Sequence, residues 1–427
     1  MDTIYAVSSG APPAAIAVLR VSGPQAFAVV RDFAGDLPAP RRAAVRALHD
    51  PSDGALLDRA LVLCFPGPNS ATGEDLAEFH LHGGRAVVRA VETALAARSG
   101  LRSAEPGEFT RRALLHGLID LSEAEGLGDL LLAETEAQRR SAIRSAEGAV
   151  RCEVEGWTDR LLGLAARVEA ELDHSDEDDV ADAALLPAIR SGAVALAADI
   201  AAVASRPPVE RLRDGIRVVL AGPPNAGKSS LFNAMAGRDA AIVSPISGTT
   251  RDRIEAPVVR SGIAWLLIDT AGLAELPGDA IEAIGIARAQ AAQAEADILL
   301  WLGDEVPPAH DNLLWLNPRA DMPGRGTDAL RLSLSSLTGE GMDRLWEAMA
   351  TLAGKLLPPP DQMALNARQR ELCQAAAASL YAVEREADLL LIAEHIRSAM
   401  RAFDGITGRA GVEAMLDALF GRFCIGK

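Results

Sequence analysis

One stretch of the chain combines glycine, lysine and serine in a spacing suited to phosphate binding. Residues 222–229 read Gly-Pro-Pro-Asn-Ala-Gly-Lys-Ser and lie between an apolar run at 216–221 and a helix-forming run at 230–235. In a strand–loop–helix unit of this kind, glycines let backbone N–H groups turn toward a phosphate at the positive end of the helix. We expect Lys228 to contact the β- and γ-phosphates of a nucleotide, and the Ser229 hydroxyl to bind Mg²⁺. A fortuitous glycine turn would lack the flanking strand and helix.

Two further motifs follow the loop in the order that nucleotide hydrolysis requires. Asp269-Thr-Ala-Gly272 comes after an apolar strand, so that Asp269 can hold Mg²⁺ through a water and the Gly272 N–H can meet the γ-phosphate. Between the loop and this motif, Gly248-Thr-Thr-Arg-Asp252 is a candidate first switch, in which a threonine hydroxyl offers a second ligand to Mg²⁺. Either motif alone is an ordinary turn; their order along the chain makes them a set.

The base-binding motif departs from its usual spacing. Guanine is normally read by Asn-Lys-x-Asp at a strand end, where the carboxylate pairs with the N1–H and the N2 amine. Here Asn317-Pro-Arg-Ala-Asp321 places the two residues one position further apart and lacks the lysine. The later stretch Ser335-Ser-Leu-Thr-Gly-Glu-Gly341 is similar to the Ser-Ala-Lys loop that supports the base. We expect guanine in preference to adenine, with weaker binding than an intact motif would give.

The elements that must position these residues divide the chain into four segments. Residues 1–117 mix short strands (16–21, 60–65 and 75–82) with a helix at 86–98 and predict a small α+β domain. Residues 118–212 and 357–427 are rich in Ala, Leu, Glu and Arg and predict a helical domain. Between them, 213–356 alternates strands with helices, as a parallel α/β sheet demands. We expect strands at 216–221, 265–268, 298–302, 313–316 and 330–334 in this α/β domain, which is inserted into the helical one.

Composition narrows the class of protein. The chain has 427 residues, 49% of them hydrophobic, and a net charge of −17, so any binding of RNA needs a local basic patch or a basic partner. Its 4 cysteines are far apart, with no Cys-x-x-Cys pair, which is typical of reduced thiols and offers no zinc site. The start resembles no signal peptide, and the apolar stretches are interrupted by charges. We therefore expect a cytoplasmic protein without membrane segments.

With these motifs placed, nearly the whole chain resembles the MnmE (TrmE) family of tRNA-modification GTPases. Thr3-Ile-Tyr-Ala, residues 16–23 and residues 72–84 are similar to N-terminal blocks of that family, as is Pro106-Gly-Glu-Phe-Thr-Arg-Arg112. Gly248-Thr-Thr-Arg-Asp252 and the closing Phe423-Cys-Ile-Gly-Lys427 complete the resemblance. The resemblance implies an N-terminal folate-binding α+β domain, an all-α domain and a Ras-like P-loop α/β G domain inserted into it.

The family resemblance also implies the activity. Members hydrolyse GTP and work with a flavin-containing partner, MnmG, in a heterotetramer or larger complex that carries FAD and uses NADH. Together they install an aminomethyl or carboxymethylaminomethyl group at C5 of uridine 34, the wobble position of certain tRNAs. The one-carbon unit comes from a tetrahydrofolate, as the 5,10-methylene or 5-formyl derivative. The implied assembly is a homodimer through the N-terminal domains, whose G domains meet across their switches.

Potassium replaces an arginine finger in the implied G-domain dimer, because a cation at the β/γ-phosphate edge neutralises charge that develops in the transition state. Carried over, the K⁺ ligands are the Asn225 side chain and backbone groups of Ser244, Ile246 and Thr249, while Ser229 and Thr250 hold Mg²⁺. Leu273 stands where Ras-like proteins have a water-orienting Gln, and the family's catalytic acid corresponds to Glu282. The residues expected to contact GTP are Asn225, Ala226, Gly227, Lys228, Ser229, Ser230, Ser244, Pro245, Ile246, Ser247, Gly248, Thr249, Thr250, Asp269, Thr270, Ala271, Gly272, Asn317, Asp321, Ser335 and Ser336.

For folate, the resemblance points to Arg20, Glu78 and Lys427. A carboxylate suits the amide-like edge of a pterin, and a cation suits the glutamyl tail. Leu118 stands where the family often has a cation near the folate, and Ala274 where it commonly has Arg. Cys424 is either a nucleophile or a residue that packs beside the folate pocket.

Alternative interpretations remain open from the residues alone. His80 and His82 share a strand face and could bind a metal, but no third ligand is evident and packing is the simpler interpretation. A ribosome-assembly GTPase would usually carry a basic RNA-binding domain, which the acidic balance does not favour. A folate one-carbon enzyme with a degenerate GTPase domain conflicts with the intact phosphate loop. The modified nucleosides of tRNA distinguish these three functions.

Overall fold

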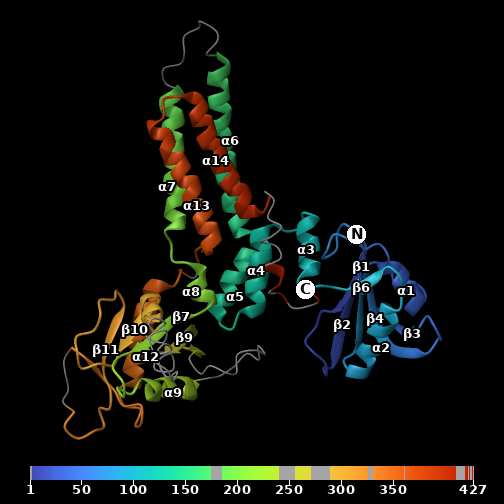
Figure 1. The fold of residues 1–427 in the computed structure, drawn as a ribbon. Coiled ribbons are helices and arrows are strands. Elements are labelled where there is room, and N and C mark those ends of the chain that lie inside the picture. The colour runs from blue at the N-terminus through green and yellow to red at the C-terminus, as the bar shows by residue number, and fades with distance from the viewer. Residues whose placement is uncertain are drawn as a thin grey trace, which may run out of the picture. The chain divides into compact units, whose positions relative to one another are not determined.

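The computed structural model describes residues 2–174, 185–239, 255–270, 289–325, 330–359, 361–409, 419–421, 423 and 426. The chain forms two compact units, Met1–Gly128 with Asp404–Lys427, and Asp129–Phe403 (Figure 1). The first unit contains an α+β domain, and the second contains a helical bundle with an α/β domain inserted between its helices. This mixed architecture confirms the predicted fold class.

The first unit is built on a six-stranded sheet in the order β3-β4-β5-β2-β1-β6. Its strands are antiparallel neighbours, except that β1 and β6 are parallel. The elements are β1 (Thr3–Val7), β2 (Ile16–Ser22), α1 (Ala26–Ala34), β3 (Ala44–His49), β4 (Leu56–Phe65), β5 (Leu76–His82), α2 (Arg85–Ala96), β6 (Leu101–Ser103), α3 (Glu108–Leu115) and α4 (Leu121–Leu132). Of these, β2, β4, β5 and α2 were expected from the sequence, whereas β1, β3 and β6 were not.

Buried and partly exposed side chains alternate along β2 and β5, and this alternation distinguishes the two faces of the sheet. Leu19 and Phe79 point into a core that they share with Val29 of α1 and Val91 of α2. Side chains of alternate parity, including Arg20, therefore lie on the opposite, partly exposed face. Arg20 and Glu78, two of the candidate folate residues, lie on that second face.

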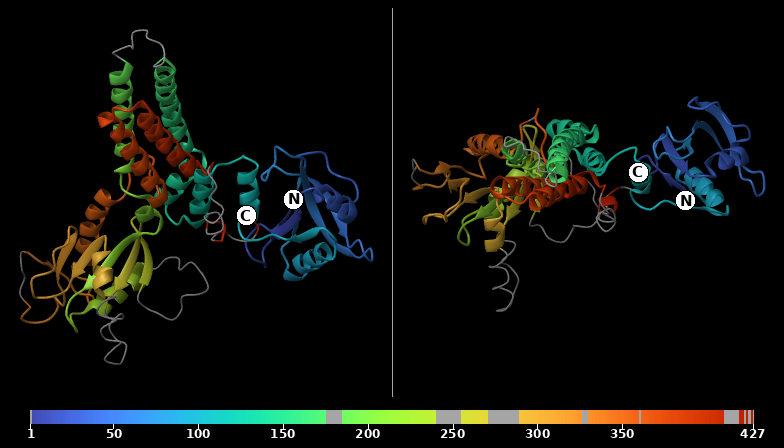
Figure 2. Two further views of the ribbon diagram at one scale, coloured as in Figure 1. Left: turned by 45° about the horizontal axis from the view of Figure 1, so that its top comes forward. Right: turned by 90° about the horizontal axis from the view of Figure 1, so that it is seen from above.

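The helices α6 (Ala149–His174), α7 (Leu185–Ala204), α13 (Ala367–Ala382) and α14 (Leu389–Thr407) lie side by side as a bundle (Figures 1 and 2). The helix α5 (Glu136–Ala146) precedes α6, η1 (Val383–Arg385) joins α13 to α14, and the short α8 (Val209–Arg213) leads into the inserted domain. Thr135 and Asn366 begin α5 and α13 with capping boxes, each reciprocated by a glutamine side chain three residues later. Trp157 of α6 packs against Phe403 of α14, with ring centroids 5.8 Å apart.

One segment in the bundle differs from expectation. Leu185–Arg213 is long and apolar enough to cross a membrane by length and composition alone, although the sequence was expected to contain no such segment. In the structure α7 packs against α6 and α13. Its inward residues, among them Ile189, Leu196 and Ile200, are fully buried. The apolar character of this helix is therefore used in the bundle core.

The inserted domain is a six-stranded sheet in the order β12-β11-β10-β7-β9-β8, parallel except for the β8–β9 pair. Its elements are β7 (Ile216–Ala221), α9 (Lys228–Asp239), β8 (Glu255–Arg260), β9 (Ile263–Asp269), β10 (Ile298–Trp301), β11 (Leu313–Asn317), β12 (Leu332–Ser333) and α12 (Met342–Leu356). The five expected strands are present, with β12 shorter than predicted and the edge strand β8 unforeseen. Helices α9 and α12 share one core with β7, β9 and β10.

Candidate nucleotide site

The phosphate loop joins the carboxyl end of the central strand β7 to the first residue of α9. Parallel strands place their carboxyl ends at one edge, where ligands of open α/β sheets bind. The loop has positive φ angles at Gly222 (143°), Asn225 (61°) and Gly227 (99°). A Cβ atom at Gly222 would lie 3.2 Å from backbone atoms of Leu302 and Gly303, a tight contact that adds to the strain of the positive φ.

Lys228 lies against the beginning of its own loop. Its ammonium donates to the carbonyl oxygens of Gly222 and Pro223, both at 2.9 Å, and the residue is 7% exposed. An ammonium has three donors in a compact group, so it can exchange carbonyl partners for phosphate oxygens without moving far. Ser229 and Ser230 are exposed in the first turn of α9. The hydroxyl of Ser229 is therefore available as an oxygen ligand for Mg²⁺.

The end of β9 lies beside the phosphate loop, because Asp269 pairs in register with Leu220 of β7. Asp269 and Thr270 are each 5% exposed. The Thr270 hydroxyl donates to the Leu220 carbonyl at 2.7 Å. Thr270 thus ties the segment after β9 to the strand that precedes the phosphate loop, and Asp269 is held at the edge where the expected Mg²⁺ would bind.

Part of the expected site lies outside the described residues. These are the two switch segments, the proposed catalytic acid and the C-terminal residues, namely Ser244, Pro245, Ile246, Ser247, Gly248, Thr249, Thr250, Ala271, Gly272, Glu282, Cys424 and Lys427.

The side chain of Asn317 supports the base loop from within. It is 4% exposed at the end of β11; its Oδ1 accepts from Arg325 Nε at 3.0 Å and its Nδ2 donates to Ser333 Oγ at 3.2 Å. Backbone bonds join the same loops, because Leu334 N–H donates to Asn317 O and Ala320 N–H to Leu334 O, both at 3.0 Å. The side-chain amide of Asn317 therefore connects the end of β11 to the end of β12 and to Arg325.

Asp321 and the serine loop complete the base side. Asp321 is exposed, and within the described part of the chain its carboxylate has no hydrogen-bond or ion-pair partner. Ser335 is fully buried, and its hydroxyl accepts from the Thr338 N–H at 3.1 Å, which shapes the turn; Ser336 is half-buried. Among the described residues of this loop, the group left to pair with a base edge is thus the carboxylate of Asp321.

Two arginines near the base loop were not foreseen from the sequence. Arg319 reaches back to the phosphate loop, where its Nη2 donates to the Asn225 carbonyl. Arg325 holds Asn317 and also pairs with Asp304 at 3.0 Å. The place of Arg319 between Asn317 and Asp321 was a usable signal. The pairing of Arg325 with Asp304, 21 residues away in sequence, has no local signal.

On the open face of the first unit's sheet, Arg20 and Glu78 face each other in register across β2 and β5. Arg20 Nε lies 2.8 Å from Glu78 Oε1, and His80 Nε2 lies 3.2 Å from Glu78 Oε2. His82 turns instead to Asp58, with 2.7 Å between Nδ1 and Oδ1. The structure thus joins the two described folate candidates and separates the two histidines. No group of three potential metal-ligating side chains occurs among the residues that the structure describes.

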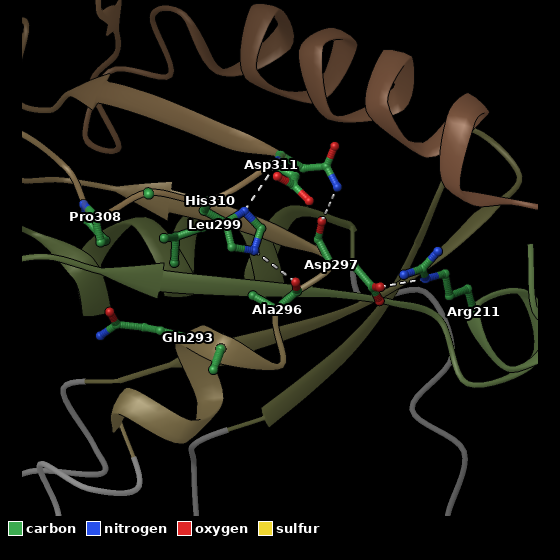
Figure 3. Close-up of a pocket in the computed structure, with 11 residues that line it drawn as sticks. Arg211, Gln293, Ala296, Asp297, Leu299, Pro308, His310 and Asp311 are labelled. Atoms are coloured by element: carbon green, nitrogen blue, oxygen red, sulfur yellow. Dashed lines mark hydrogen bonds and ion pairs between the residues drawn. The ribbon is translucent and has the colours of Figure 1, made fainter.

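A cavity of about 470 Å³ lies elsewhere on the inserted domain (Figure 3). Its walls include Asp297 and His310, which precede β10 and β11 and therefore lie at the amino ends of the strands. Asp297 pairs with Arg211 of α8 at 2.6 Å, and His310 Nε2 lies 3.0 Å from the Ala296 carbonyl. The cavity is thus at the edge of the sheet opposite the phosphate loop, so it is not the nucleotide site.

The similarity to known proteins extends over the full length of the chain. Residues 3–118 match the family described as GTP-binding protein TrmE N-terminus, and residues 121–424 match the MnmE helical domain. The chain is 55% identical over 428 residues to the tRNA modification GTPase MnmE of Erythrobacter litoralis, with 100% of both chains covered. It is 56% identical over 429 residues to that of Rhizorhabdus wittichii, covering 100% of this chain and 97% of the relative. The G domain of the T. maritima FeoB iron transporter matches with 25% identity and a TM-score of 0.24, covering 32% of this chain and 98% of that structure. A phosphate loop on a parallel sheet, inserted into a helical domain that follows a TrmE-type N-terminal domain, places this chain in the MnmE family of tRNA modification GTPases.

Proposed function

We propose that this chain hydrolyses GTP and that hydrolysis serves the modification of tRNA. The observation that carries the proposal is the phosphate loop, with its strand, its helix and the buried Lys228, inside a chain that matches MnmE relatives along its whole length. Guanine is the proposed base, because the exposed carboxylate of Asp321 can accept from two donors on one edge of guanine, whereas adenine offers no such pair. Competition of ATP with bound GTP tests this; equal affinities would remove the preference for guanine.

We propose further that hydrolysis depends on K⁺ and on the pairing of two G domains in a homodimer. Asn225 is exposed in the phosphate loop and has a positive φ, and its side-chain oxygen is of the type that hard cations prefer. In the proposed site Asn225 and backbone groups of Ser244, Ile246 and Thr249 hold K⁺, and Ser229 and Thr250 hold Mg²⁺. Glu282 is the proposed catalytic acid that positions water. These metals would offset the negative charge of the transferring phosphoryl group.

A direct test of the cation compares GTP turnover in KCl and NaCl. Turnover should be faster in KCl, and Asn225→Ala should remove most of the difference while it leaves the Mg²⁺ requirement intact. The control is Ser205→Ala, at an exposed position in the described part of the bundle. Equal rates in the two salts for the unmodified protein would contradict the proposed K⁺ dependence and leave the GTPase assignment standing.

The proposed substrate is the wobble uridine 34 of certain tRNAs, modified at C5 to an aminomethyl or carboxymethylaminomethyl group with a folate one-carbon unit. A MnmG-type flavoprotein that binds FAD and NADH is the proposed partner, in a heterotetramer or larger complex. On the N-terminal unit, Arg20 and Glu78 form a paired cation and carboxylate on an accessible sheet face, which are suitable types for a tetrahydrofolate. Lys427 and Cys424 are the proposed additions from the C-terminus. We propose a cytoplasmic location, in keeping with free cysteines at 64, 152 and 373.

The decisive experiment is a nucleoside profile of tRNA from cells with and without this gene, by liquid chromatography and mass spectrometry. Loss of the C5-modified wobble uridine, and its return with the unmodified gene, is the expected result. Complementation with Lys228→Ala should fail, because the phosphate contacts are lost. An unchanged profile would favour the ribosome-assembly or folate-metabolism alternatives and would reject the proposed function.

A further inference from the structure

We propose that Ser8 is a further binding residue of the folate face, where its hydroxyl donates to a carbonyl oxygen carried on N5 of a reduced pterin. This role rests on the proposed function, since it assumes that Arg20 and Glu78 bind a tetrahydrofolate. The Ser8 Oγ atom is buried and has no hydrogen-bond partner among the residues that the structure describes. Buried hydroxyls nearly always have a partner, so an orphan hydroxyl beside a candidate ligand face is a candidate contact.

The pairing of three strands places Ser8 on the same face as the two described folate candidates. Ala6 lies opposite Arg20, and Arg20 lies opposite Glu78. Two residues beyond Ala6, the Ser8 N–H donates to the Val18 carbonyl at 2.7 Å, which continues the pairing of β1 with β2. Because side chains alternate along a strand, Ser8 follows Ala6 onto the face that carries Arg20.

The half-buried Val18 is the floor of a small polar frame on this face. It lies between Ser8 on one side and His80 of β5, its partner in register, on the other. Arg20 and Glu78 form the next row of the sheet. Two strand spacings and a rise of two residues separate Ser8 from Glu78 by about 12 Å between Cα atoms. A bicyclic pterin that lies flat on Val18, with its donor edge at Glu78, therefore extends toward Ser8.

The two ends of such a ligand need opposite groups. A carboxylate accepts from the N3–H and the 2-amine of a pterin, as proposed for Glu78, whereas a carbonyl on N5 needs a donor. A serine hydroxyl is such a donor, and rotation about χ1 can turn Oγ from its covered position to a ligand. A Cβ atom at Gly426 would lie 3.0 Å from the Ser8 Cα. Ser8 thus lies where the sheet face meets a described residue of the C-terminal segment.

A ligand-binding hydroxyl and a structural hydroxyl predict different effects on stability. Ser8→Ala removes a buried polar atom that has no described partner, so the free chain should be as stable as before or slightly more stable. The neighbouring Ser9 provides the contrast, because its Oγ accepts from the Val18 N–H at 3.1 Å. Ser9→Ala should therefore lower the stability of the chain.

The test uses the full-length chain and measures dissociation constants of 5-formyl-tetrahydrofolate and 5-methyl-tetrahydrofolate by isothermal titration calorimetry. The two probes share the pterin edge and the glutamyl tail, and they differ in whether the N5 substituent has an acceptor oxygen. Ser8→Ala should weaken binding of the 5-formyl compound by about 3- to 10-fold, the loss expected for one hydrogen bond between neutral groups. It should change binding of the 5-methyl compound by less than about twofold, because that compound has no acceptor for the hydroxyl. Thermal melting of Ser8→Ala and Ser9→Ala in the absence of ligand completes the comparison.

The possible results separate this role of Ser8 from the proposed function. If the unmodified chain binds neither probe, the folate proposal is rejected, and the role of Ser8 with it. If the chain binds the probes but Ser8→Ala changes both dissociation constants equally or not at all, only the role of Ser8 is overturned. A loss of thermal stability in Ser8→Ala as large as that in Ser9→Ala would also overturn it, because the hydroxyl would then be a structural contact. Selective weakening of the 5-formyl compound, in a variant that melts no lower than the unmodified chain, supports it.

Discussion

Replacing Arg112 by methionine should strongly destabilise the sheet of the N-terminal unit. Arg112 is 4% exposed, and its guanidinium donates to the Asp2 carbonyl at 2.8 Å, to Glu74 Oε2 at 2.9 Å and to Glu108 Oε1 at 3.0 Å. Methionine is also long and unbranched, but it supplies neither the charge nor the donors. The variant therefore tests what the cation itself contributes.

The size of the stability loss follows from the hydrogen-bond and ion-pair partners that each acidic side chain retains in the variant. Glu108 retains Arg102 at 2.6 and 2.8 Å, and the Asp2 side chain, 48% exposed, can turn to water. The Glu74 side chain is 10% exposed and, among the residues that the structure describes, keeps only the Ser22 hydroxyl, at 2.7 Å. One buried carboxylate is thus left without a cation, which costs about 3–5 kcal/mol. Adding Glu74→Gln removes that charge and should return the stability to within about 1–2 kcal/mol of the unmodified chain.

The stability of the N-terminal unit should respond to acidification in opposite directions in the unmodified chain and in Arg112→Met. Burial alone would raise the pKa of Glu108, but hydrogen bonds from Arg102, the Glu105 N–H and Arg112 outweigh it and hold the pKa below its ordinary 4.5. The unmodified unit therefore has this contribution above pH 4.5 and loses it as the pH falls through the folded-state pKa. In Arg112→Met a carboxylate buried without a cation takes up a proton more readily when folded than when unfolded. The variant should therefore regain stability on acidification from neutral pH toward about pH 5.

Hydrogen exchange is the appropriate assay, because all 5 tryptophans of the chain fall within residues 129–403 and fluorescence would not report on this unit. Amides of β1 and β2 should exchange at least about 100-fold faster in the variant at pH 7, which corresponds to the lower limit of the predicted loss. Amides of β7 and β10 serve as the internal control. Protection of β1 and β2 that changes less than about threefold, or a gap that widens at pH 5, would refute the reasoning.

Other contacts give simpler predictions. Burial raises the pKa of the Cys373 thiol to about 12. An alkylating reagent at pH 8 should therefore modify the exposed Cys152 and spare the buried Cys373. Peptide mass mapping measures this, and equal modification of the two cysteines would contradict it. Thr135→Ala removes the cap of α5 and should cost about 1 kcal/mol in denaturant unfolding; no loss would mean that the cap is replaced by water. Asp297→Ala removes the acceptor of the Arg211 guanidinium and of the Arg217 N–H, and should lower the free energy of unfolding by about 2–3 kcal/mol. Denaturant unfolding monitored by tryptophan fluorescence measures this loss. An unchanged stability would show that the contact with α8 is not needed.

Local sequence patterns predicted the parts of the fold that have local causes. The strand β7, the glycine loop and α9 follow from apolar periodicity and from the conformations that only certain residues adopt. Strand β8 was missed because it lies at the sheet edge, where Pro257 interrupts it and burial is slight. Strand β3 was missed for a similar reason, since Leu48 is its one fully buried residue. Weak burial leaves a strand with little sequence signature.

The base side of the nucleotide site depends instead on contacts between distant loops. Asn317 was expected at the base because of its motif, yet its amide is occupied by Arg325 and Ser333. Nothing near Arg325 in the sequence indicates that it would meet Asp304, which also holds Arg331 at 2.7 Å. Any residue pair with complementary donors could make such contacts, so residue type alone does not predict them.

This difference explains how a base loop with one extra residue can be accommodated. A phosphate loop is determined by backbone geometry, and at Gly222 a φ of 143° would strain any other residue. A base loop, by contrast, needs only that its carboxylate be fixed in position, and different side-chain contacts can do this. Here the buried Pro318 lengthens the spacing, while Arg319 anchors the base loop to the Asn225 carbonyl of the phosphate loop. Deleting Pro318 alone to restore the usual spacing should therefore harm binding, because Arg319 would move away from the carbonyl that it now holds.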